Sequence, residues 1–402
     1  MSPSLLITSL KMMRNKNIKK IPKKTVFSLL AILKNERFIT FDDKILFSLH
    51  LPPYPSKALD RFFEAGIKAM DGVNIPGIVN IAVTHHCRYH CWHCSASPKN
   101  GTDLPLQTII DTIQKFQDMG TYLFSITGGE PLIREDLVDI IASIDDRSSV
   151  FVFTSGDGLT VEKARELKQA GLFGVMLSLD HYAPEIHDRL RGYKGAYDNF
   201  INGVRNAQQA HLYVGVSSVI SKEILKNNEQ WRLLETAQNL SVQEVMMFEP
   251  TPVGELFLDD SCLLSTNERR QLIEFHKQIN SNRTYKKYPK LSVFPYYESE
   301  EFQGCTAGYS LVYVDADGNL RPCDFVPLIF GNIQEEPLEV LWQKMNHAFH
   351  KPRAFCFMLE NHELMRHIGN GEYPLSYEKS LEVCRRCPSS RVPRIYKKIG
   401  IT

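Results

Sequence analysis

Apolar and polar residues alternate through the middle of the chain in a repeating order of short apolar runs and longer amphipathic segments. The short runs have the length of buried strands and lie at 79–83, 122–126, 150–153, 174–179, 213–219 and 243–248. The segments between them have helical spacing of apolar residues and lie at 106–119, 135–145, 160–171, 197–210 and 222–240. Because strands that alternate with helices form parallel sheets with right-handed crossovers, the pattern predicts an α/β domain over residues 76–255.

A basic region precedes this domain. Residues 1–75 carry thirteen Lys and Arg against six Asp and Glu, a net charge of +7. Many of these cations lie at 11–24, directly before the apolar run 25–33, for which we expect a helix. A second amphipathic helix is expected over 56–70, with Ser56 as its N-cap. We predict that this region is a helical extension packed on the domain; the alternative is a basic surface that contacts an anionic membrane or an acidic partner.

Composition narrows the class of protein. The 402 residues are 43% hydrophobic and 23% charged, with a net charge of +1, which argues against general nucleic-acid binding. No apolar run has the length of a membrane-spanning helix, and the charged residues 34–37 stand where a signal peptide has small residues for cleavage. The nine cysteines have the spacing of metal ligands rather than of disulfides, so we expect a reducing, cytoplasmic environment.

Three of these cysteines follow the first apolar run. Cys87, Cys91 and Cys94 have the spacing C-x3-C-x2-C. A tight loop of this kind can direct three thiolates to one point, and three thiolates on a four-iron cluster leave one iron without a protein ligand. An open metal position is a site for chemistry. A zinc site or unconnected core cysteines are the alternatives.

Two further motifs follow later apolar runs. Gly128-Gly129-Glu130 comes after the run 122–126, and two glycines allow the backbone to approach a ligand closely, while a carboxylate can accept hydrogen bonds from an ammonium group. Ser178-Leu179-Asp180-His181 ends the run 174–179 and leads into residues 184–195, which include Arg189 and Arg191. These motifs fall at predicted carboxyl ends of strands, where the sites of parallel α/β domains lie.

The three motifs, in this order, resemble those of radical SAM enzymes that have a C-terminal cluster domain. The resemblance implies a partial (β/α)6 TIM-like barrel in which Cys87, Cys91 and Cys94 bind a catalytic [4Fe–4S] cluster and S-adenosylmethionine (SAM) chelates its fourth iron. The SAM contacts that it implies are Gly128, Gly129 and Glu130 for the amino group, Arg191 or Arg189 for the carboxylate, and Ser178 and Asp180 for the ribose hydroxyls. Two more strand ends, 154–158 and 248–255 with Glu249, are candidates for the rim of the site.

A second set of cysteines lies in the last hundred residues. An expected β-hairpin with an Asp-Gly-Asn turn ends at Cys323, five residues after Gly318, and Cys384-Arg385-Arg386-Cys387 is a C-x2-C pair. This layout resembles the SPASM and twitch domains of radical SAM enzymes and is similar to that of the radical SAM dehydrogenase of aminoglycoside biosynthesis.

The chain departs from a full SPASM domain, because no cysteine follows Cys387. We therefore expect residues 301–402 to form a twitch-like α+β domain with one auxiliary [4Fe–4S] cluster, joined to the barrel by a helical connection at 256–300. The expected ligands are Cys305, Cys323, Cys384 and Cys387, and zinc on the same thiolates is the alternative. Cys262 and Cys356 lie in apolar surroundings and are expected to be free thiols.

The resemblance implies an enzyme that cleaves SAM reductively to a 5′-deoxyadenosyl radical and abstracts hydrogen from a substrate. We expect oxidative modification or cross-linking of a peptide, with a reductase, flavodoxin or ferredoxin as electron donor. The alternatives are a radical SAM enzyme for a small molecule or membrane lipid, and a non-enzymatic iron–sulfur or zinc protein. The basic N-terminal region is the only hint of peripheral membrane contact.

Overall fold

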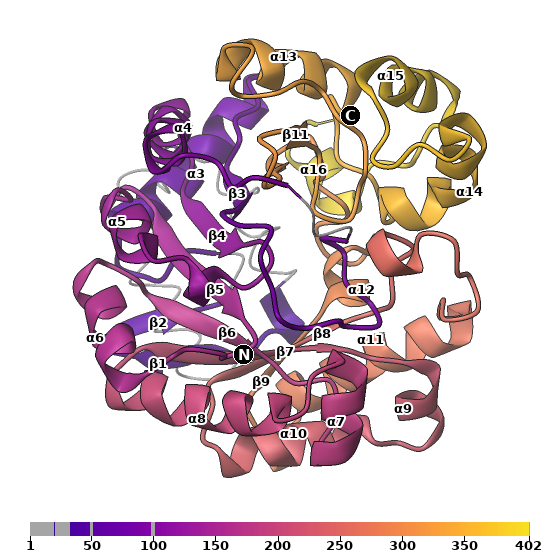
Figure 1. Ribbon diagram of the computed structural model, residues 1–402. Helices are drawn as coiled ribbons and strands as arrows, with labels where there is room; N and C mark the ends of the chain where they lie inside the picture. Colours follow the sequence, from indigo (N-terminus) through magenta and orange to yellow (C-terminus); the bar gives the residue numbers. More distant parts are fainter. Residues whose placement is uncertain (1–19, 21–32, 49–50, 98–100, 402) are drawn as a thin grey trace.

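A single nine-stranded sheet organises the described residues of the computed structural model, in the order β11-β10-β3-β4-β5-β6-β7-β8-β9 (Figure 1). The structure describes residues 20, 33–48, 51–97 and 101–401. Six strands pair in parallel and in sequence order: β3 (Ile78–Ala82), β4 (Leu123–Thr127), β5 (Ser149–Thr154), β6 (Gly174–Ser178), β7 (Tyr213–Val219) and β8 (Glu244–Phe248). This curved sheet confirms the predicted α/β fold of a partial TIM-like barrel.

Helices connect the strands on the outside of the barrel (Figure 1). They are α4 (Leu106–Met119), α5 (Leu137–Ala142), α6 (Val161–Gln169), α7 (Pro184–Arg191), α8 (Ala196–Gln209), α9 (Lys222–Lys226) and α10 (Gln230–Asn239). The segment 222–240, expected as one helix, is two, because Asn228 adopts a left-handed φ of 58° between them. Helix α7 was not predicted from periodicity, since only His187 and Arg191 of its eight residues are buried.

The sheet continues beyond the six strands on both sides. Strand β9 (Lys290–Val293) pairs with β8, so the segment 256–300, expected as a helical connection, also supplies a strand after α11 (Thr266–Ser281). On the other side, β10 (Leu311–Val314) pairs in parallel with β3, and β11 (Leu320–Arg321) completes the expected hairpin. The C-terminal region is therefore joined to the barrel by main-chain hydrogen bonds.

Further helices follow β9, and α13 to α16 lie beside β11 and β10, on the side of the sheet where β3 is (Figure 1). They are α12 (Phe294–Tyr297), α13 (Leu338–Ala348), α14 (Phe357–Gly369), α15 (Tyr377–Arg386) and α16 (Arg394–Lys398). Buried residues of α13 and α14, such as Leu341 and Met365, belong to the same hydrophobic core as the barrel interior. Packing across the two regions thus adds to the shared sheet.

The N-terminal extension packs against the amino ends of the barrel strands. Helix α3 (Lys57–Met70) begins as predicted, with the Ser56 hydroxyl accepting the backbone N–H of Leu59 at 3.0 Å. Strands β1 (Ile39–Phe41) and β2 (Lys44–Leu46) form a hairpin that was not predicted, and Leu46 packs against the first residues of several barrel strands. The helix expected at 25–33 and most of the basic stretch 11–24 lie outside the described residues.

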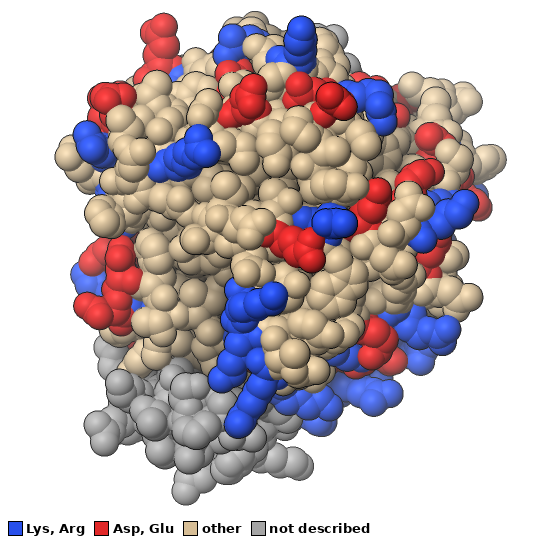
Figure 2. All heavy atoms as spheres, turned by 90° about the horizontal axis from the view of Figure 1, so that it is seen from below, with Lys and Arg blue, Asp and Glu red and all other residues tan. Residues whose placement is uncertain are grey.

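The surface carries both signs of charge. Figure 2 shows Lys and Arg side chains interspersed with Asp and Glu over one face, which agrees with the net charge of +1. Among the helices of the described residues, none combines the length and the apolar character that a membrane span needs.

A buried charge network fastens the N-terminal extension to the barrel. Lys290 Nζ lies 2.9 Å from Glu36 Oε2 and 3.6 Å from Glu244 Oε1, and His276 Nε2 lies 2.9 Å from Glu36 Oε1. Burial opposes the charge of Lys290, but the two carboxylates prevail and raise the pKa of this ammonium group. The network lies at the starts of β8 and β9, away from the carboxyl ends of the strands, and so indicates a role in stability.

We expect Lys290→Met to lower the free energy of unfolding by about 3–5 kcal/mol, because the change leaves buried carboxylates without their cation. Lys57→Met is the matched control, since Lys57 forms an exposed pair with Asp146 that water screens, so the change should leave stability nearly unaltered. Chemical denaturation of both variants measures the difference. Equal losses would show that the buried network does not fasten the extension.

Candidate active site

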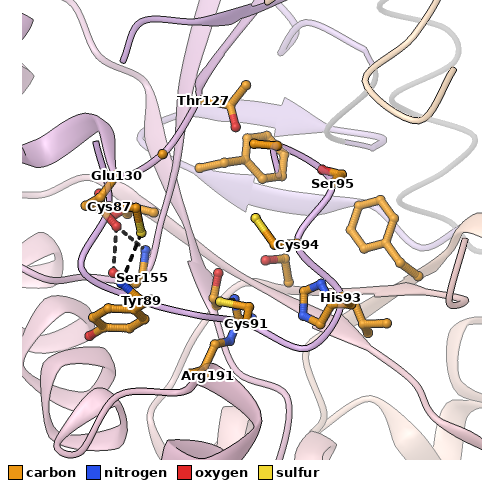
Figure 3. A pocket seen from close by; sticks show the side chains of 18 of the residues that line it. Cys87, Tyr89, Cys91, His93, Cys94, Ser95, Thr127, Glu130, Ser155 and Arg191 are labelled. Carbon is orange, nitrogen blue, oxygen red and sulfur yellow. Dashed lines mark hydrogen bonds between the residues drawn. The ribbon is translucent and has the colours of Figure 1, made fainter. Parts of the chain in front are cut away.

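The loop that follows β3 carries Cys87, Cys91 and Cys94. All three line one pocket at the carboxyl ends of the barrel strands, and their sulfur atoms face this pocket (Figure 3). The backbone N–H of Tyr89 donates to Cys87 Sγ at 3.4 Å, and Arg191 Nη1 lies 3.7 Å from Cys91 Sγ. The structure thus brings together the three cysteines that the sequence grouped.

Gly128-Gly129-Glu130 supports the start of this cysteine loop. The backbone N–H groups of Gly129 and Glu130 donate to the carbonyl oxygens of Thr84 and His86, each at 2.7 Å. A Cβ atom on Gly129 would lie 2.1 Å from the His86 oxygen, so a side chain there would push the two loops apart. Gly129 therefore allows the backbone of its own loop to lie close to the backbone at His86.

Other segments hold the middle and the end of the cysteine loop. Two backbone N–H groups of the cysteine loop donate to carbonyl oxygens in the last turn of α7. His90 donates to Arg191 at 3.0 Å, and Trp92 donates to Leu190 at 3.1 Å. Gly254, in the loop after β8, has a φ of 57°, and a Cβ there would lie 2.0 Å from the Cys94 carbonyl oxygen. Gly254 lies in the segment 248–255 predicted at the rim of the site, but only the tertiary contact reveals its role.

Asp180 joins Arg191 and His93 below the cysteine loop. Asp180 is fully buried, and its Oδ2 lies 2.8 Å from Arg191 Nε and 3.0 Å from His93 Nε2. Burial alone would raise the pKa of Asp180, but the charge of Arg191 prevails and holds this pKa far below its usual range. Asp180 is thus an ionised group that positions Arg191 beside Cys91. Its role toward ribose hydroxyls stays a prediction, as does the role of Arg191 toward a carboxylate.

The Glu130 carboxylate is saturated by its neighbours. It accepts hydrogen bonds from Thr154 Oγ1 at 2.6 Å, from Ser155 N at 2.8 Å, from Ser155 Oγ at 2.6 Å and from Leu132 N at 3.1 Å. A carboxylate offers about four lone-pair sites, so Glu130 fastens the loop after β5 to the end of β4. Binding of an ammonium group by Glu130 stays a prediction.

The loop 154–158 also contacts the cysteine loop directly. Arg88 donates to Asp157 from Nε at 2.9 Å and from Nη2 at 2.6 Å, and Asn199 donates to the Tyr89 hydroxyl at 2.8 Å. The Tyr89 ring stacks on that of Tyr193, with centroids 4.5 Å apart. These contacts orient the cysteine loop, in which Tyr89 itself lines the pocket, and the sequence positions of the partners alone do not indicate that role.

The far wall of the pocket comes from later strands and from the C-terminal region. Ser178, Ser217 and Glu249 line it at the ends of β6, β7 and β8, and Phe325 reaches it from the segment after Cys323. No sequence signal pointed to Phe325. The pocket therefore lies between the cysteine loop and the C-terminal cysteine region.

Glu249 is the titratable group of this wall. Burial raises the pKa of Glu249 to about 7, against the opposing charge of Arg269, whose Nε lies 2.9 Å from Glu249 Oε2. A carboxyl group of this kind can hold or release a proton near neutral pH. Arg269 lies on α11, a helix that the sequence analysis assigned to the connection between domains.

We expect stability to fall as pH rises from 5 to 8 more steeply in the metal-free protein than in Glu249→Gln. The folded-state pKa of Glu249 lies above the ordinary 4.5, so its contribution is fully present below pH 4.5 and is lost as pH rises through about 7. Between pH 5 and pH 8, the free energy of unfolding should fall by about 2–3 kcal/mol more in the unsubstituted protein than in Glu249→Gln. Denaturation at several pH values measures it, and parallel curves would contradict the shift.

The C-terminal cysteines form two groups. Cys305 and Cys323 are buried behind the pocket wall, and burial raises the pKa of the Cys305 thiol to about 12. Cys384 and Cys387 lie at the end of α15, where Arg353 Nη2 donates to Cys387 Sγ at 3.2 Å. Cys356 is buried as expected. Cys262 lies apart, with its thiol donating to the Asp259 carbonyl oxygen at 3.3 Å.

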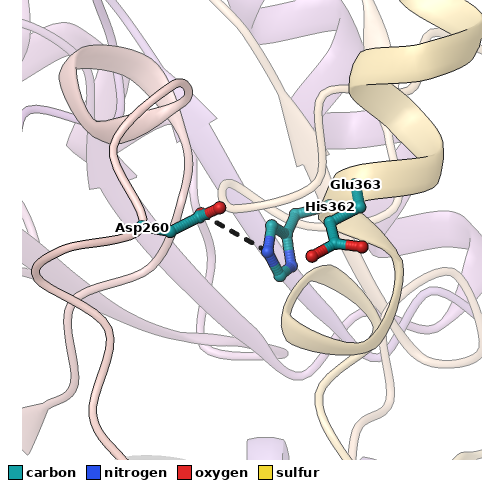
Figure 4. A group of neighbouring side chains, drawn as sticks. All are labelled: Asp260, His362 and Glu363. Carbon is teal, nitrogen blue, oxygen red and sulfur yellow. Dashed lines mark ion pairs between the residues drawn. The ribbon is translucent and has the colours of Figure 1, made fainter.

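A third group of possible ligands lies on the surface. Asp260, His362 and Glu363 face one another between the loop after β8 and α14 (Figure 4). Arg366 already binds Asp260 through two hydrogen bonds of 2.7 Å, and His362 Nε2 lies 3.4 Å from Asp260 Oδ1. These contacts make the group an ion-pair link between the barrel and the C-terminal region.

The donor set in the pocket fits an iron–sulfur cluster. Three thiols around one space match the preference of such clusters for thiolate ligands, and the N–H donor near Cys87 and the cation near Cys91 suit negatively charged sulfur. Three cysteines leave one position of a four-iron cluster for another ligand. Ser178, Ser217 and Glu249 line the same pocket and could contact a ligand bound there.

Comparison with known families agrees with this chemistry. Residues 81–225 match the model of the radical SAM superfamily, and residues 305–388 match an iron–sulfur cluster-binding domain, SPASM. The chain belongs to the radical SAM superfamily and carries a C-terminal SPASM domain. It is therefore an enzyme of this class, and the non-enzymatic alternative is wrong.

The curated relatives have different named activities. The chain is 25% identical over 291 residues to the AdoMet-dependent heme synthase of Methanosarcina barkeri, and the aligned residues cover 67% of this chain and 83% of that protein. It is 26% identical over 254 residues to the probable GTP 3′,8-cyclase of Archaeoglobus fulgidus, covering 61% and 84%.

Solved structures share the fold. SuiB of Streptococcus suis bound to the precursor peptide SuiA has a TM-score of 0.60 at 14% identity and covers 80% of this chain and 78% of that one. The enzyme anSMEcpe with bound AdoMet has a TM-score of 0.52 at 16% identity, covering 68% and 82%.

Proposed function

We propose that this enzyme binds SAM and an organic substrate in the pocket beside Cys87, Cys91 and Cys94 and oxidises the substrate, with a peptide as the first candidate. One observation carries the proposal. The three cysteines, the ends of the barrel strands and Phe325 of the SPASM domain line the same pocket. A substrate held there touches both the cysteine loop and the region of the auxiliary cysteines.

A cluster held by Cys87, Cys91 and Cys94 would supply the electron for reductive cleavage of SAM, and a cluster held by the SPASM cysteines would supply an electron acceptor for substrate oxidation. The chain supplies position and proton transfer. Asp180 and Arg191 fix the cysteine loop. Phe248 and Phe325, with ring centroids 6.0 Å apart, exclude water from the inner wall. Glu249, with its pKa near 7, accepts the proton that leaves the substrate with the second electron.

Two substrate classes remain in competition. The fold shared with SuiB and anSMEcpe, both determined with peptides, supports a peptide. The sequence relatives named heme synthase and GTP 3′,8-cyclase support a small molecule. The proposal of a membrane lipid as substrate is supported only by the basic segment 11–24. An electron donor such as a reductase, flavodoxin or ferredoxin is required in each case.

Anaerobic incubation with SAM, a reductant and a cell extract tests the proposal. We expect 5′-deoxyadenosine together with a peptide whose mass falls by two hydrogens. If a small metabolite loses two hydrogens instead, the result would support the proposed oxidation and contradict the proposed peptide substrate. A product of unchanged oxidation state, formed at full rate without the auxiliary cysteines in a folded protein, would contradict the oxidative role.

Iron analysis tests the number of clusters. One auxiliary cluster besides the SAM cluster gives about eight iron atoms per chain after reconstitution. About twelve would contradict the single auxiliary cluster, and about four with stoichiometric zinc would favour a structural metal in the SPASM domain.

A further inference from the structure

The loop after β8 contacts the end of the cysteine loop at one wall of the pocket. The Glu255 backbone N–H donates to the Cys94 carbonyl oxygen at 3.0 Å, and the Glu255 carboxylate accepts the Ser97 hydroxyl at 2.5 Å. Gly254 lies directly against the same carbonyl oxygen, and Val253 lines the pocket. The position of this loop therefore helps to determine where the backbone of Cys94 lies.

Tyr373 of the SPASM domain holds this loop at Gly254. Tyr373 lies in the connection between α14 and α15, and its hydroxyl accepts the backbone N–H of Gly254 at 2.7 Å. Its ring lies against that of Phe257, with centroids 4.7 Å apart. Because Gly254 precedes Glu255 directly, a fixed Gly254 also fixes the residue that contacts Cys94. Tyr373 is thus connected to the cysteine loop through two hydrogen bonds, its own and that of Glu255.

The backbone beside Tyr373 is held in turn by the segment that follows Phe325. The N–H of Leu375 donates to the Pro327 carbonyl oxygen at 2.8 Å, and the N–H of Ile329 donates to the Leu375 carbonyl oxygen at 3.1 Å. Leu375 is fully buried, and Phe325 lines the pocket. Tyr373 therefore belongs to the packed part of the SPASM domain that also supplies a wall of the pocket.

Arg366 attaches the SPASM domain to the same loop further along the chain. Besides its two hydrogen bonds to Asp260, Arg366 donates from Nε to the Phe257 carbonyl oxygen. The SPASM domain thus holds the loop at Gly254, Phe257 and Asp260. Of these three positions, Gly254 adjoins the contact with the cysteine loop. The Tyr373 hydroxyl is therefore the attachment that bears most directly on that contact.

We propose that Tyr373 is a positioning residue for the SAM cluster and acts through the loop after β8 on the backbone of Cys94. The SPASM domain then helps to set the geometry of the cysteine loop, besides carrying cysteines of its own. The inference rests on the proposed function in that it assumes a cluster on Cys87, Cys91 and Cys94 that binds SAM. It assigns a role to a tyrosine that belongs to no cysteine motif.

Hydrogen exchange in the metal-free, full-length chain tests the link without any cluster. Tyr373→Phe keeps the ring and removes the hydroxyl, so the Gly254 N–H loses this partner. We expect the peptides that cover residues 88–97 and 251–257 to exchange about tenfold faster, because an N–H group without its partner favours local opening. Helix α8 should keep its exchange rate.

Two further variants serve as controls. Tyr285→Phe is the matched change, because the Tyr285 hydroxyl accepts a hydrogen bond from Gln278 Nε2 at 2.9 Å but does not line the pocket, and it should leave both peptides unaltered. Gly254→Ala perturbs the junction directly, since its Cβ would lie 2.0 Å from the Cys94 carbonyl oxygen. It should speed exchange at both peptides at least as much as Tyr373→Phe does.

The reconstituted enzyme gives a second readout, the change that added SAM causes in the electron paramagnetic resonance spectrum of the reduced protein. We expect Tyr373→Phe to alter this spectral change. It should also lower kcat/KM for SAM cleavage by about tenfold, the lower end of the usual effect of removing a group that orients a metal site. Tyr285→Phe should match the wild type in both measurements.

The outcomes separate this inference from the proposed function. A folded Tyr373→Phe protein with wild-type exchange at both peptides, or with a wild-type spectral response to SAM, overturns the inference alone. Faster exchange throughout the chain, α8 included, would assign Tyr373 to the stability of the fold and would also overturn it. A wild-type chain that forms no 5′-deoxyadenosine overturns the proposed function, while exchange in the metal-free protein still decides whether Tyr373 holds the cysteine loop.

Discussion

Replacing Cys87, Cys91 and Cys94 together with alanine is expected to abolish formation of 5′-deoxyadenosine from SAM. The three sulfur atoms face one pocket, and within the described residues no other cysteine lines it. An iron–sulfur cluster that loses all of its protein ligands has nothing to hold it at this position. Chromatography of the anaerobic reaction, with dithionite as reductant, measures the nucleoside.

The control for this prediction is the auxiliary iron. The triple variant should keep about four iron atoms and a thermal unfolding transition close to that of the wild type, because the SPASM cysteines lie behind the pocket wall. Cys262→Ala serves as a cysteine variant that should keep full activity. Undiminished 5′-deoxyadenosine in the triple variant would show that the SAM site lies elsewhere.

Asp180→Asn is expected to lower 5′-deoxyadenosine formation by about 10- to 100-fold, the usual effect of removing a group that orients a metal site. The amide cannot balance the buried charge of Arg191, whose Nη1 lies 3.7 Å from Cys91 Sγ. His93, in the cysteine loop itself, loses its carboxylate partner as well. Unfolding should become easier by about 3–5 kcal/mol, because one buried charge is left unpaired.

Asp118→Asn is the matched control for this change. Asp118 also pairs with an arginine, Arg147, at 2.8 Å, but its side chain is 72% exposed, so its loss should cost less than about 1 kcal/mol. SAM cleavage and denaturation are measured on both variants. If Asp180→Asn keeps wild-type activity while it loses stability, Asp180 supports the fold and does not position the cysteine loop.

The sequence predicted the elements that local pattern specifies. Strand β7 begins and ends where the predicted run 213–219 does, because Tyr213, Val214 and Val216 supply the buried apolar side chains that a parallel strand needs. Helix α3 begins after Ser56 because its hydroxyl caps the helix. The three cysteines could be grouped because they lie within eight residues of one another, so that a single loop carries them.

Contacts between residues that lie far apart along the chain could not be predicted from the sequence. Arg191 and Asp180 were both candidates for SAM, but their distance of 2.8 Å from each other depends on how α7 packs beneath the cysteine loop. Phe325 carries no motif, and it reaches the pocket only because β10 pairs with β3 and brings the SPASM domain to the mouth of the barrel. The β1–β2 hairpin is too short to be recognised from its sequence pattern, and its contacts with the barrel stabilise it.

The sequence by itself determined the class of this protein, since the spacing C-x3-C-x2-C, the Gly-Gly-Glu motif and the alternation of strands and helices are local properties of the chain. Tertiary structure decided which polar groups serve one another. Burial made Asp180 the partner of Arg191 and His93 and saturated Glu130 with four hydrogen bonds. A buried polar group must find a partner, and which one it finds depends on how separate segments pack, which spacing along the chain does not encode.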